Sequence, residues 1–271
     1  MKLDLLNVKV DQVTMDQTIQ EVITWCAGTS KHYIVTPNIE FLMIARKDES
    51  FRSVLNQADL SIPDSARLSW LFFELNQKNP FLKLIVWPLF FAPKLLPVRY
   101  FDTVTGTDLM ARLIKVASEK SLTIGLLGGR SGLANMLKDR LIKLNPGLKV
   151  VYANSDILVN LDGEDENAET TIEFQRLQTQ IPETDILFVA LGQVKQEKWI
   201  AKNLYKFSVK VMVGVGGAFD YLSGIVPRAP KIIRALGLEW LFRLLHQPSR
   251  IKRFGALVSF VFLVLKSKNK S

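Results

Sequence analysis

The sequence predicts an α/β fold whose parallel sheet is covered by helices on both faces. Short β-rich runs alternate with longer amphipathic segments, a spacing typical of parallel strands joined by crossover helices. Several of these runs end in glycine or small polar residues, as strands do where a ligand binds at their carboxyl ends. With 48% of its 271 residues hydrophobic, the chain can bury a sizeable core.

The expected elements follow one another along most of the chain. Strands are expected at 32–36, 59–62, 122–127, 148–153, 186–191 and 210–215, and amphipathic helices at 107–120 and 133–144. The first twenty residues mix aspartates with apolar residues and lack the pattern of a signal peptide, so we expect a cytoplasmic protein. Cys26 cannot form an internal disulfide, and one cysteine with two histidines, His32 and His246, is too few for a zinc site. Cys26 is expected to be a buried packing residue, and no metal or cofactor is expected.

The positive charge of the chain lies in its C-terminal part. From residue 228 onward there are ten basic residues and one acidic residue, whereas residues 1–227 contain 25 of each. We therefore expect a main domain at 1–227, the α/β part of the chain, and a basic amphipathic appendage at 228–271. Such an appendage can bind anionic lipid, nucleic acid or the phosphates of a ligand.

Two apolar runs indicate contact with a membrane surface. Residues 84–93 contain two prolines, and residues 254–265 lie between Arg253 and Lys266. Both are shorter than the roughly 20 residues that span a bilayer, and both suit an interfacial segment flanked by basic residues. The alternative is that each run is buried against the domain or an oligomer partner.

Glycine-rich loops follow three of the expected strands, at 128–132, 192–193 and 214–217. Glycine lets backbone N–H groups approach a phosphate closely, so Gly128, Gly129 and Gly216 are candidates for binding a nucleotide. Each loop can instead be a simple turn. The chain contains no GxGxxG or Walker A motif, which disfavours a dehydrogenase or a P-loop NTPase.

A carboxylate and two short polar side chains follow neighbouring strands. Thr36 and Asn38 follow the strand at 32–36, and Asp64 follows the strand at 59–62. A carboxylate at this edge can act as a base that takes the proton of a substrate hydroxyl, and Asp64 is placed for that role. Asp64 or Ser65, and likewise Asn38, can instead cap the helices that follow.

The leaving diphosphate also needs positive charge. Metal-dependent transferases use an Asp-x-Asp motif, which this chain lacks, and its acidic run at 162–166 is expected to be a solvated loop. Arg243, Arg250 and Arg253 can supply the charge, although Pro248 interrupts the helical spacing between them. A lipid-facing basic surface is the alternative.

Taken together, these motifs resemble the WecG/TagA/CpsF glycosyltransferases over nearly the whole chain. The matching runs lie at 35–40, 58–64, 104–109, 126–129, 191–198, 214–220, 227–230 and 237–244.

The resemblance implies a Rossmann-like domain with a C-terminal helical appendage that binds the membrane. It also implies metal-independent, inverting transfer of an N-acetylmannosamine-type sugar from a UDP-sugar to an undecaprenyl-diphosphate-linked acceptor. Such an enzyme is peripheral on the inner face of the cell membrane, serves cell-surface polysaccharide or teichoic acid synthesis, and has no nucleic-acid partner. A homo-oligomer is left open.

The resemblance also assigns roles to individual residues. It gives Asp64 the role of the base and makes Thr36 and Asn38 its companions. Gln196 and Asp220 fall where the family contacts the nucleotide, while the three appendage arginines, Arg243, Arg250 and Arg253, match those that close over the diphosphate.

The chain departs from the family pattern in three places. Thr103 stands where the family usually has an arginine, with Arg99 nearby as a substitute, and the chain between Trp70 and Thr103 is longer than in most relatives. The usual Glu-Pro of the tail is Gln247-Pro248.

The second hypothesis is a non-catalytic nucleotide-binding α/β module whose basic tail binds lipid or nucleic acid. Binding of DNA without binding of UDP would favour it.

Overall fold

The computed structural model describes residues 1–79, 81–82, 85, 87–95, 102–166, 175, 181–246 and 260. Its centre is a six-stranded sheet in the order β4-β3-β8-β7-β5-β6, and every neighbouring pair of strands is parallel. The strands are β3 (His32–Val35), β4 (Leu60–Ser61), β5 (Thr123–Gly128), β6 (Lys149–Asn154), β7 (Thr184–Ala190) and β8 (Val209–Gly214). All six strands expected from the sequence are therefore confirmed.

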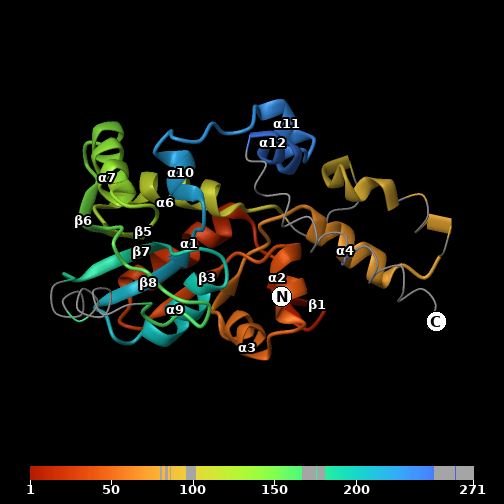
Figure 1. Ribbon diagram of the computed structural model, residues 1–271, viewed down its shortest axis with the longest axis horizontal. Coiled ribbons are helices and arrows are strands. Elements are labelled where there is room, and N and C mark those ends of the chain that lie inside the picture. The colour runs from red at the N-terminus through yellow and green to blue at the C-terminus, as the bar shows by residue number, and fades with distance from the viewer. Residues whose placement is uncertain are drawn as a thin grey trace.

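Helices cover both faces of the sheet (Figure 1), which confirms the Rossmann-like α/β class. One face carries α2 (Ile39–Ala45), α3 (Glu49–Gln57), α4 (Arg67–Asn76) and α9 (Lys195–Asn203). The other face carries α1 (Met15–Ala27), α6 (Gly106–Lys120), α7 (Leu133–Leu144) and α10 (Ala218–Leu222). Alternate residues of one strand serve the two cores: Tyr33 and Val35 belong to the first core, and Ile34 to the second.

Polar caps fix where several helices begin. Thr14 and Gln17 form a reciprocal capping box at α1, and the side chain of Thr105 accepts the N–H of Asp108 at α6. Cys26 lies in α1 and is 4% exposed, which confirms the expected packing role. Burial and, to a smaller extent, the charge of Asp185 raise the pKa of its thiol to about 12.

The N-terminal hairpin was not predicted. Strands β1 (Lys2–Leu5) and β2 (Val8–Asp11) pair antiparallel around Leu6 and Asn7, both of which have positive φ. This turn geometry normally signals itself through Asn-Gly or Asp-Gly, and Leu-Asn gives no such signal. The hairpin joins the edge of the main sheet, where the N–H of Ser61 donates to Asp11 Oδ2 at 2.9 Å.

The segment between α4 and α6 contains two short 3₁₀ helices, η1 (Trp87–Phe90) and η2 (Pro93–Leu95). The ring of Phe90 packs against Trp70 of α4 at 4.9 Å and against Phe260 at 5.7 Å, and both phenylalanines are fully buried. Phe260 belongs to the apolar run 254–265, and it is the one position of that run that the structure describes. At this position the alternative of burial against the domain is the one observed.

Besides Phe260, the described part of the expected appendage contains α11 (Lys231–Ala235) and α12 (Glu239–His246). Among the residues that the structure describes, no helix has the length and apolar character needed to cross a bilayer.

Candidate functional site

The candidate site lies where the sheet changes its direction of winding. After β3 the chain crosses to the face of α2 and α3, whereas after β8 it crosses to the face of α10. Ligands bind at such switch points, outside the carboxyl ends of the strands. Thr36 bridges the two strand ends, because its Oγ1 donates to the carbonyl of Gly214 at 3.4 Å.

Asp64 reaches the same edge from β4. Its backbone N–H donates to the carbonyl of Pro37 at 3.1 Å, so the chain after β4 is tied to the chain after β3. Its Oδ1 accepts the N–H of Gly106, the first residue of α6, at 2.9 Å. This half-buried carboxylate therefore lies at the N-terminus of α6, the positive end of the helix dipole.

The capping alternatives have different outcomes at the two strand ends. Asn38 caps α2, since its Oδ1 accepts the N–H of Phe41 at 3.2 Å. At the other strand end, Ser65 Oγ accepts the N–H of Arg67, the first residue of α4, at 3.2 Å, whereas Asp64 Oδ1 contacts α6. The geometry that the sequence missed is the contact of Asp64 with α6, which begins 42 residues later.

Gly106 fills the centre of this group. A methyl group added at its Cα would lie 3.7 Å from Thr36 Oγ1 and 3.6 Å from the carbonyl oxygen of Val215. The glycine therefore leaves room between the carboxylate, the threonine and the end of β8. Thr36 and Asp64 lie at the same edge of the sheet, as the sequence predicted. The N-terminus of α6 joins them there, which the sequence did not predict.

The first turn of α6 is tied to the start of the appendage. Arg228 Nη2 lies 2.6 Å from Asp108 Oδ2, which also accepts the hydroxyl of Thr105 at 2.7 Å. Partial burial alone would raise the pKa of Asp108, but the bonds from Arg228 and Thr105 hold it below its ordinary value. The turn that presents the Gly106 N–H to Asp64 is thereby anchored.

A cavity of about 520 Å³ lies beside this group. Ala66, two residues after Asp64, and Val104, whose N–H donates to Pro63, both line the cavity. Polar and charged side chains from α1, α4 and the segment before α6 share the wall; they are Thr14, Asp16, Ser69, Lys94, Asp102 and Thr103. Thr103 thus lines a space next to Asp64, the candidate base.

The glycine loops occupy the rest of the edge. Gly128 has φ +92°, and a Cβ there would lie 2.8 Å from the carbonyl of Ala190, so the close approach of β5 to β7 requires glycine. Gly129 donates its N–H to the same carbonyl at 2.9 Å. Four strand spacings, roughly 19 Å, separate β5 from β4, so a ligand contacting both ends would have to be extended.

Asp220 lies next to the loop after β5. Its Oδ1 is 2.6 Å from Arg130 Nη2, and both side chains are partly exposed. The ion pair therefore joins the loop at Gly129 to α10, which follows the loop at Gly216.

Gln196 is buried, at 2% exposure, and both ends of its carboxamide are engaged. Its Oε1 accepts the N–H of Gly216 at 3.1 Å, and its Nε2 donates to Glu197 at 2.6 Å. Burial raises the pKa of Glu197, and the hydrogen bonds from Gln196 and the Val194 N–H offset part of this increase. The resulting pKa is about 7. Sequence reasoning missed Glu197, although it stands inside the quoted run 191–198.

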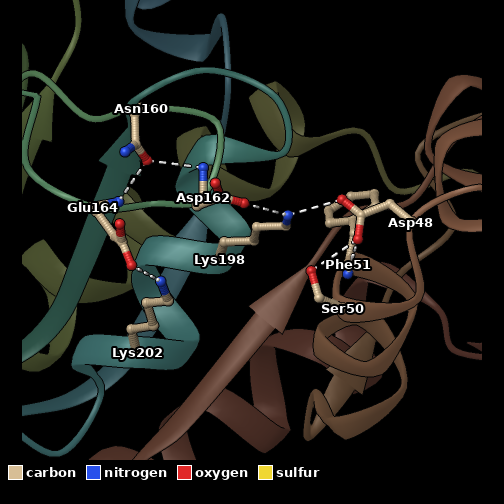
Figure 2. A network of polar contacts seen from close by, with 8 residues as sticks. All are labelled: Asp48, Ser50, Phe51, Asn160, Asp162, Glu164, Lys198 and Lys202. Carbon is tan, nitrogen blue, oxygen red and sulfur yellow. Dashed lines mark hydrogen bonds and ion pairs between the residues drawn. The ribbon is translucent and has the colours of Figure 1, made fainter.

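Lys198, on the next position of α9, ties that helix to two other segments (Figure 2). Its Nζ lies 2.8 Å from Asp48, the N-cap of α3, and 3.3 Å from Asp162 in the loop after β6. Gly163 packs against the backbone of Lys198 and Trp199, and Glu164 binds Lys202 at 2.8 Å. The acidic run expected to be a solvated loop is exposed in part, but it is docked on α9.

The appendage arginines cannot be placed against this site. Arg243 lies on α12, with its side chain outside the described residues, and Arg250 and Arg253 lie outside them entirely. In the part of the chain that the structure describes, no group of three or more His, Cys, Asp or Glu side chains is arranged to hold a metal ion.

Comparisons with known proteins match this chain along its length. The model of the glycosyl transferase WecG/TagA/CpsF family matches residues 3–83 and 84–271. A Staphylococcus aureus (strain MRSA252) protein named N-acetylglucosaminyldiphosphoundecaprenol N-acetyl-beta-D-mannosaminyltransferase is 28% identical, over 99% of this chain and 94% of the relative. The protein of the same name from strain MW2 is 27% identical over the same shares.

Proposed function

The chain belongs to the WecG/TagA/CpsF family of glycosyltransferases, and on that premise we propose which sugar it transfers and how. The donor is a UDP-sugar of the N-acetylmannosamine type, and the acceptor is N-acetylglucosamine linked through a diphosphate to undecaprenol. The names of the Staphylococcus aureus relatives support this pair of substrates. The product serves the synthesis of a cell-surface polysaccharide or teichoic acid.

Asp64 is the general base of the reaction. It takes the proton of the acceptor hydroxyl while the hydroxyl oxygen forms a bond to the anomeric carbon of the donor sugar. The bond from that carbon to the diphosphate breaks on the opposite side, and UDP leaves with the electron pair, so the configuration inverts. The convergence of Asp64, Thr36 and the N-terminus of α6 carries this proposal.

The negative charge of the leaving UDP is balanced without a metal. The sequence has no Asp-x-Asp motif, and its appendage supplies Arg243, Arg250 and Arg253. The glycine loops at Gly128, Gly129 and Gly216, together with Asp220, form the nucleotide-binding edge, where the absence of side chains lets a ligand approach closely. Asn38, the cap of α2, completes the pocket around Thr36.

Residues 228–271 form an appendage that meets the inner face of the cell membrane together with the segment after α4. Apolar side chains are exposed on both parts: Phe81, Ile85, Phe91 and Leu95 on the segment, and Ile232, Leu241 and Leu245 on the helices. The two parts adjoin, because a Cβ at Gly237 would lie 3.2 Å from Pro93. A lipid surface would cover this apolar face and bring the acceptor to the site.

Release of UDP from a panel of UDP-sugars tests the function. The assay compares the wild type with Asp64→Asn, with and without a short-chain lipid-diphosphate-GlcNAc acceptor, in the presence of EDTA. We expect acceptor-dependent release that survives EDTA and falls at least a hundredfold, of the order of 10² to 10⁴, in the variant. A folded wild type that binds UDP but releases none from any donor would instead support the non-catalytic module.

A further inference from the structure

Glu197 is a fully buried carboxylate that the proposed reaction does not use. It lies in the first turn of α9, under the end of β8, where a Cβ added at Gly214 would come within 3.0 Å of its Oε1. Its Oε2 accepts the N–H of Val194 at 2.8 Å, and its Oε1 accepts Nε2 of Gln196 at 2.6 Å. Both oxygens are therefore used as acceptors.

These contacts determine which way the Gln196 carboxamide points. An ionised carboxylate can only accept hydrogen bonds, so the NH₂ group of Gln196 must face Glu197. The carbonyl oxygen of Gln196 then faces the N–H of Gly216, at 3.1 Å. With the opposite orientation, two acceptors would meet at Glu197 and two donors at Gly216.

We propose that Glu197 is a positioning residue: by orienting Gln196 it holds the loop Gly214–Gly217 in the shape that receives the UDP part of the donor. This inference rests on the proposed function of that loop. The loop has a second anchor, because Thr36 Oγ1 donates to the carbonyl of Gly214. Glu197 thus acts on the same loop that Thr36 joins to the catalytic edge.

No other charged side chain shares the contacts of Glu197 in the described structure. Its neighbour Lys198 turns toward Asp48 and Asp162 (Figure 2), and the influences on its ionisation are burial and hydrogen bonds from Gln196 and the backbone. A substitution at Glu197 therefore changes the hydrogen bonds around Gln196 without removing an ion pair.

The isosteric variant Glu197→Gln makes the arrangement impossible. A glutamine has one accepting oxygen and one donating NH₂ group in place of two acceptors. If its oxygen faces Val194, its NH₂ group faces that of Gln196; if its oxygen faces Gln196, its NH₂ group faces the Val194 N–H. Gln196 relieves the first clash by rotating, and it then turns its own NH₂ group toward the Gly216 N–H.

The test compares wild type, Glu197→Gln, Gln196→Ala and the double variant at about pH 8, where Glu197 is mostly ionised. Hydrogen exchange of the Gly216 amide, followed by NMR, reports on the loop without requiring activity. Steady-state kinetics of donor turnover separate KM from kcat. Glu21→Gln, which changes an exposed glutamate of α1, is the matched control.

We expect the Gly216 amide to exchange roughly tenfold faster in Glu197→Gln and in Gln196→Ala, with no further increase in the double variant. The donor KM should rise about tenfold while kcat changes by less than about threefold, and amides of β8 before Gly214 should keep their protection. Unchanged Gly216 exchange would overturn the proposal, and so would a general loss of protection across β8, since Glu197 would then serve the fold as a whole.

Failure of the proposed function would look different. Suppose that the wild type turns over no UDP-sugar but the Gly216 amide still exchanges faster in Glu197→Gln than in the wild type. Glu197 would then still shape the loop, and only the proposal that the loop binds the nucleotide would be wrong.

Discussion

At the scale of single residues, burial links the ionisation of Glu197 to the stability of the fold. Its carboxyl titrates near 4.5 when exposed and near 7 in the folded protein. Between these pH values the folded state binds more protons than the unfolded state. The contribution of Glu197 to the free energy of unfolding therefore falls as the pH rises from about 4.5 to about 7.

Glu197→Gln should remove this dependence, because an amide does not ionise. Between about pH 4.5 and pH 7, the unfolding free energy of the wild type should fall by about 3 kcal/mol more than that of the variant. Urea denaturation at a series of pH values measures the difference. Parallel curves for the two proteins would show that Glu197 is not buried as an ionisable group.

Gly106 gives a second prediction at this scale. Gly106→Ala places a methyl group between Thr36 and the end of β8, at ordinary contact distances, in the first position of a helix. Alanine reduces the entropy of the unfolded chain, so stability should be unchanged or rise by about 0.5 kcal/mol. Sugar transfer should fall roughly tenfold to a hundredfold, because the methyl group takes up space beside Thr36 that the substrate needs for correct positioning.

Thermal unfolding and initial rates check this pair of effects on one preparation. Gly28→Ala, at the end of α1 and away from the site, is the control and should leave the rate unchanged. A fully active Gly106→Ala enzyme would mean that the space beside Thr36 is not occupied during the reaction.

At the scale of elements, Lys198 joins three parts of the chain that lie far apart in sequence. Its side chain is 8% exposed, and its ammonium group binds Asp48 and Asp162, which are 150 and 36 residues away. Partial burial alone would raise the pKa of Asp48. The hydrogen bond from Lys198, together with those from Phe51 and Ser50, instead lowers this pKa to about 2. The stability that this contact contributes is present above about pH 4 and is lost as the pH falls toward 2.

Lys198→Met should separate the loop at 157–166 from α3 while keeping the packing of the side chain's methylene groups. We expect a loss of about 1 to 2 kcal/mol, since the lysine is buried but its partners are partly exposed. Lys202→Met breaks the more exposed pair with Glu164 and should cost less than Lys198→Met. Equal losses in chemical denaturation would contradict the ranking.

The sequence predicts features that depend on neighbouring residues better than contacts between residues that are far apart in the chain. The six strands and the helices α6 and α7 follow from local periodicity, and the carboxyl-edge positions of Thr36 and Asp64 follow from parallel topology. The contacts of Asp64 with Gly106 and of Lys198 with Asp48 join residues 42 and 150 positions apart. No local pattern contains such pairs, so the anchors of the site emerged only from the structure.

At the scale of the whole molecule, the catalytic edge and the apolar face are connected through short links. Asp64 contacts the N-terminus of α6, Arg228 binds Asp108 in the same turn, and the appendage that begins there adjoins η2 through Gly237. Under the proposed function, these contacts would connect the lipid-facing appendage to Asp64 through α6.

The membrane-facing role predicts how vesicle binding depends on the exposed apolar side chains. Phe81, Phe91 and Ile232 are 68%, 47% and 74% exposed, so replacing all three with serine should leave the core intact. Each side chain contributes about 1.5 to 3 kcal/mol when it leaves water, so the partition coefficient for vesicles of phosphatidylethanolamine and phosphatidylglycerol should fall by at least about a hundredfold.

The control replaces Leu144 and Leu161, which are 64% and 67% exposed on other parts of the fold, with serine. It should sediment with vesicles like the wild type, and both variants should use a water-soluble, short-chain acceptor normally. If the triple variant also sediments like the wild type, the apolar face binds something other than lipid. If it loses activity on the soluble acceptor as well, the segment 81–95 shapes the active site itself.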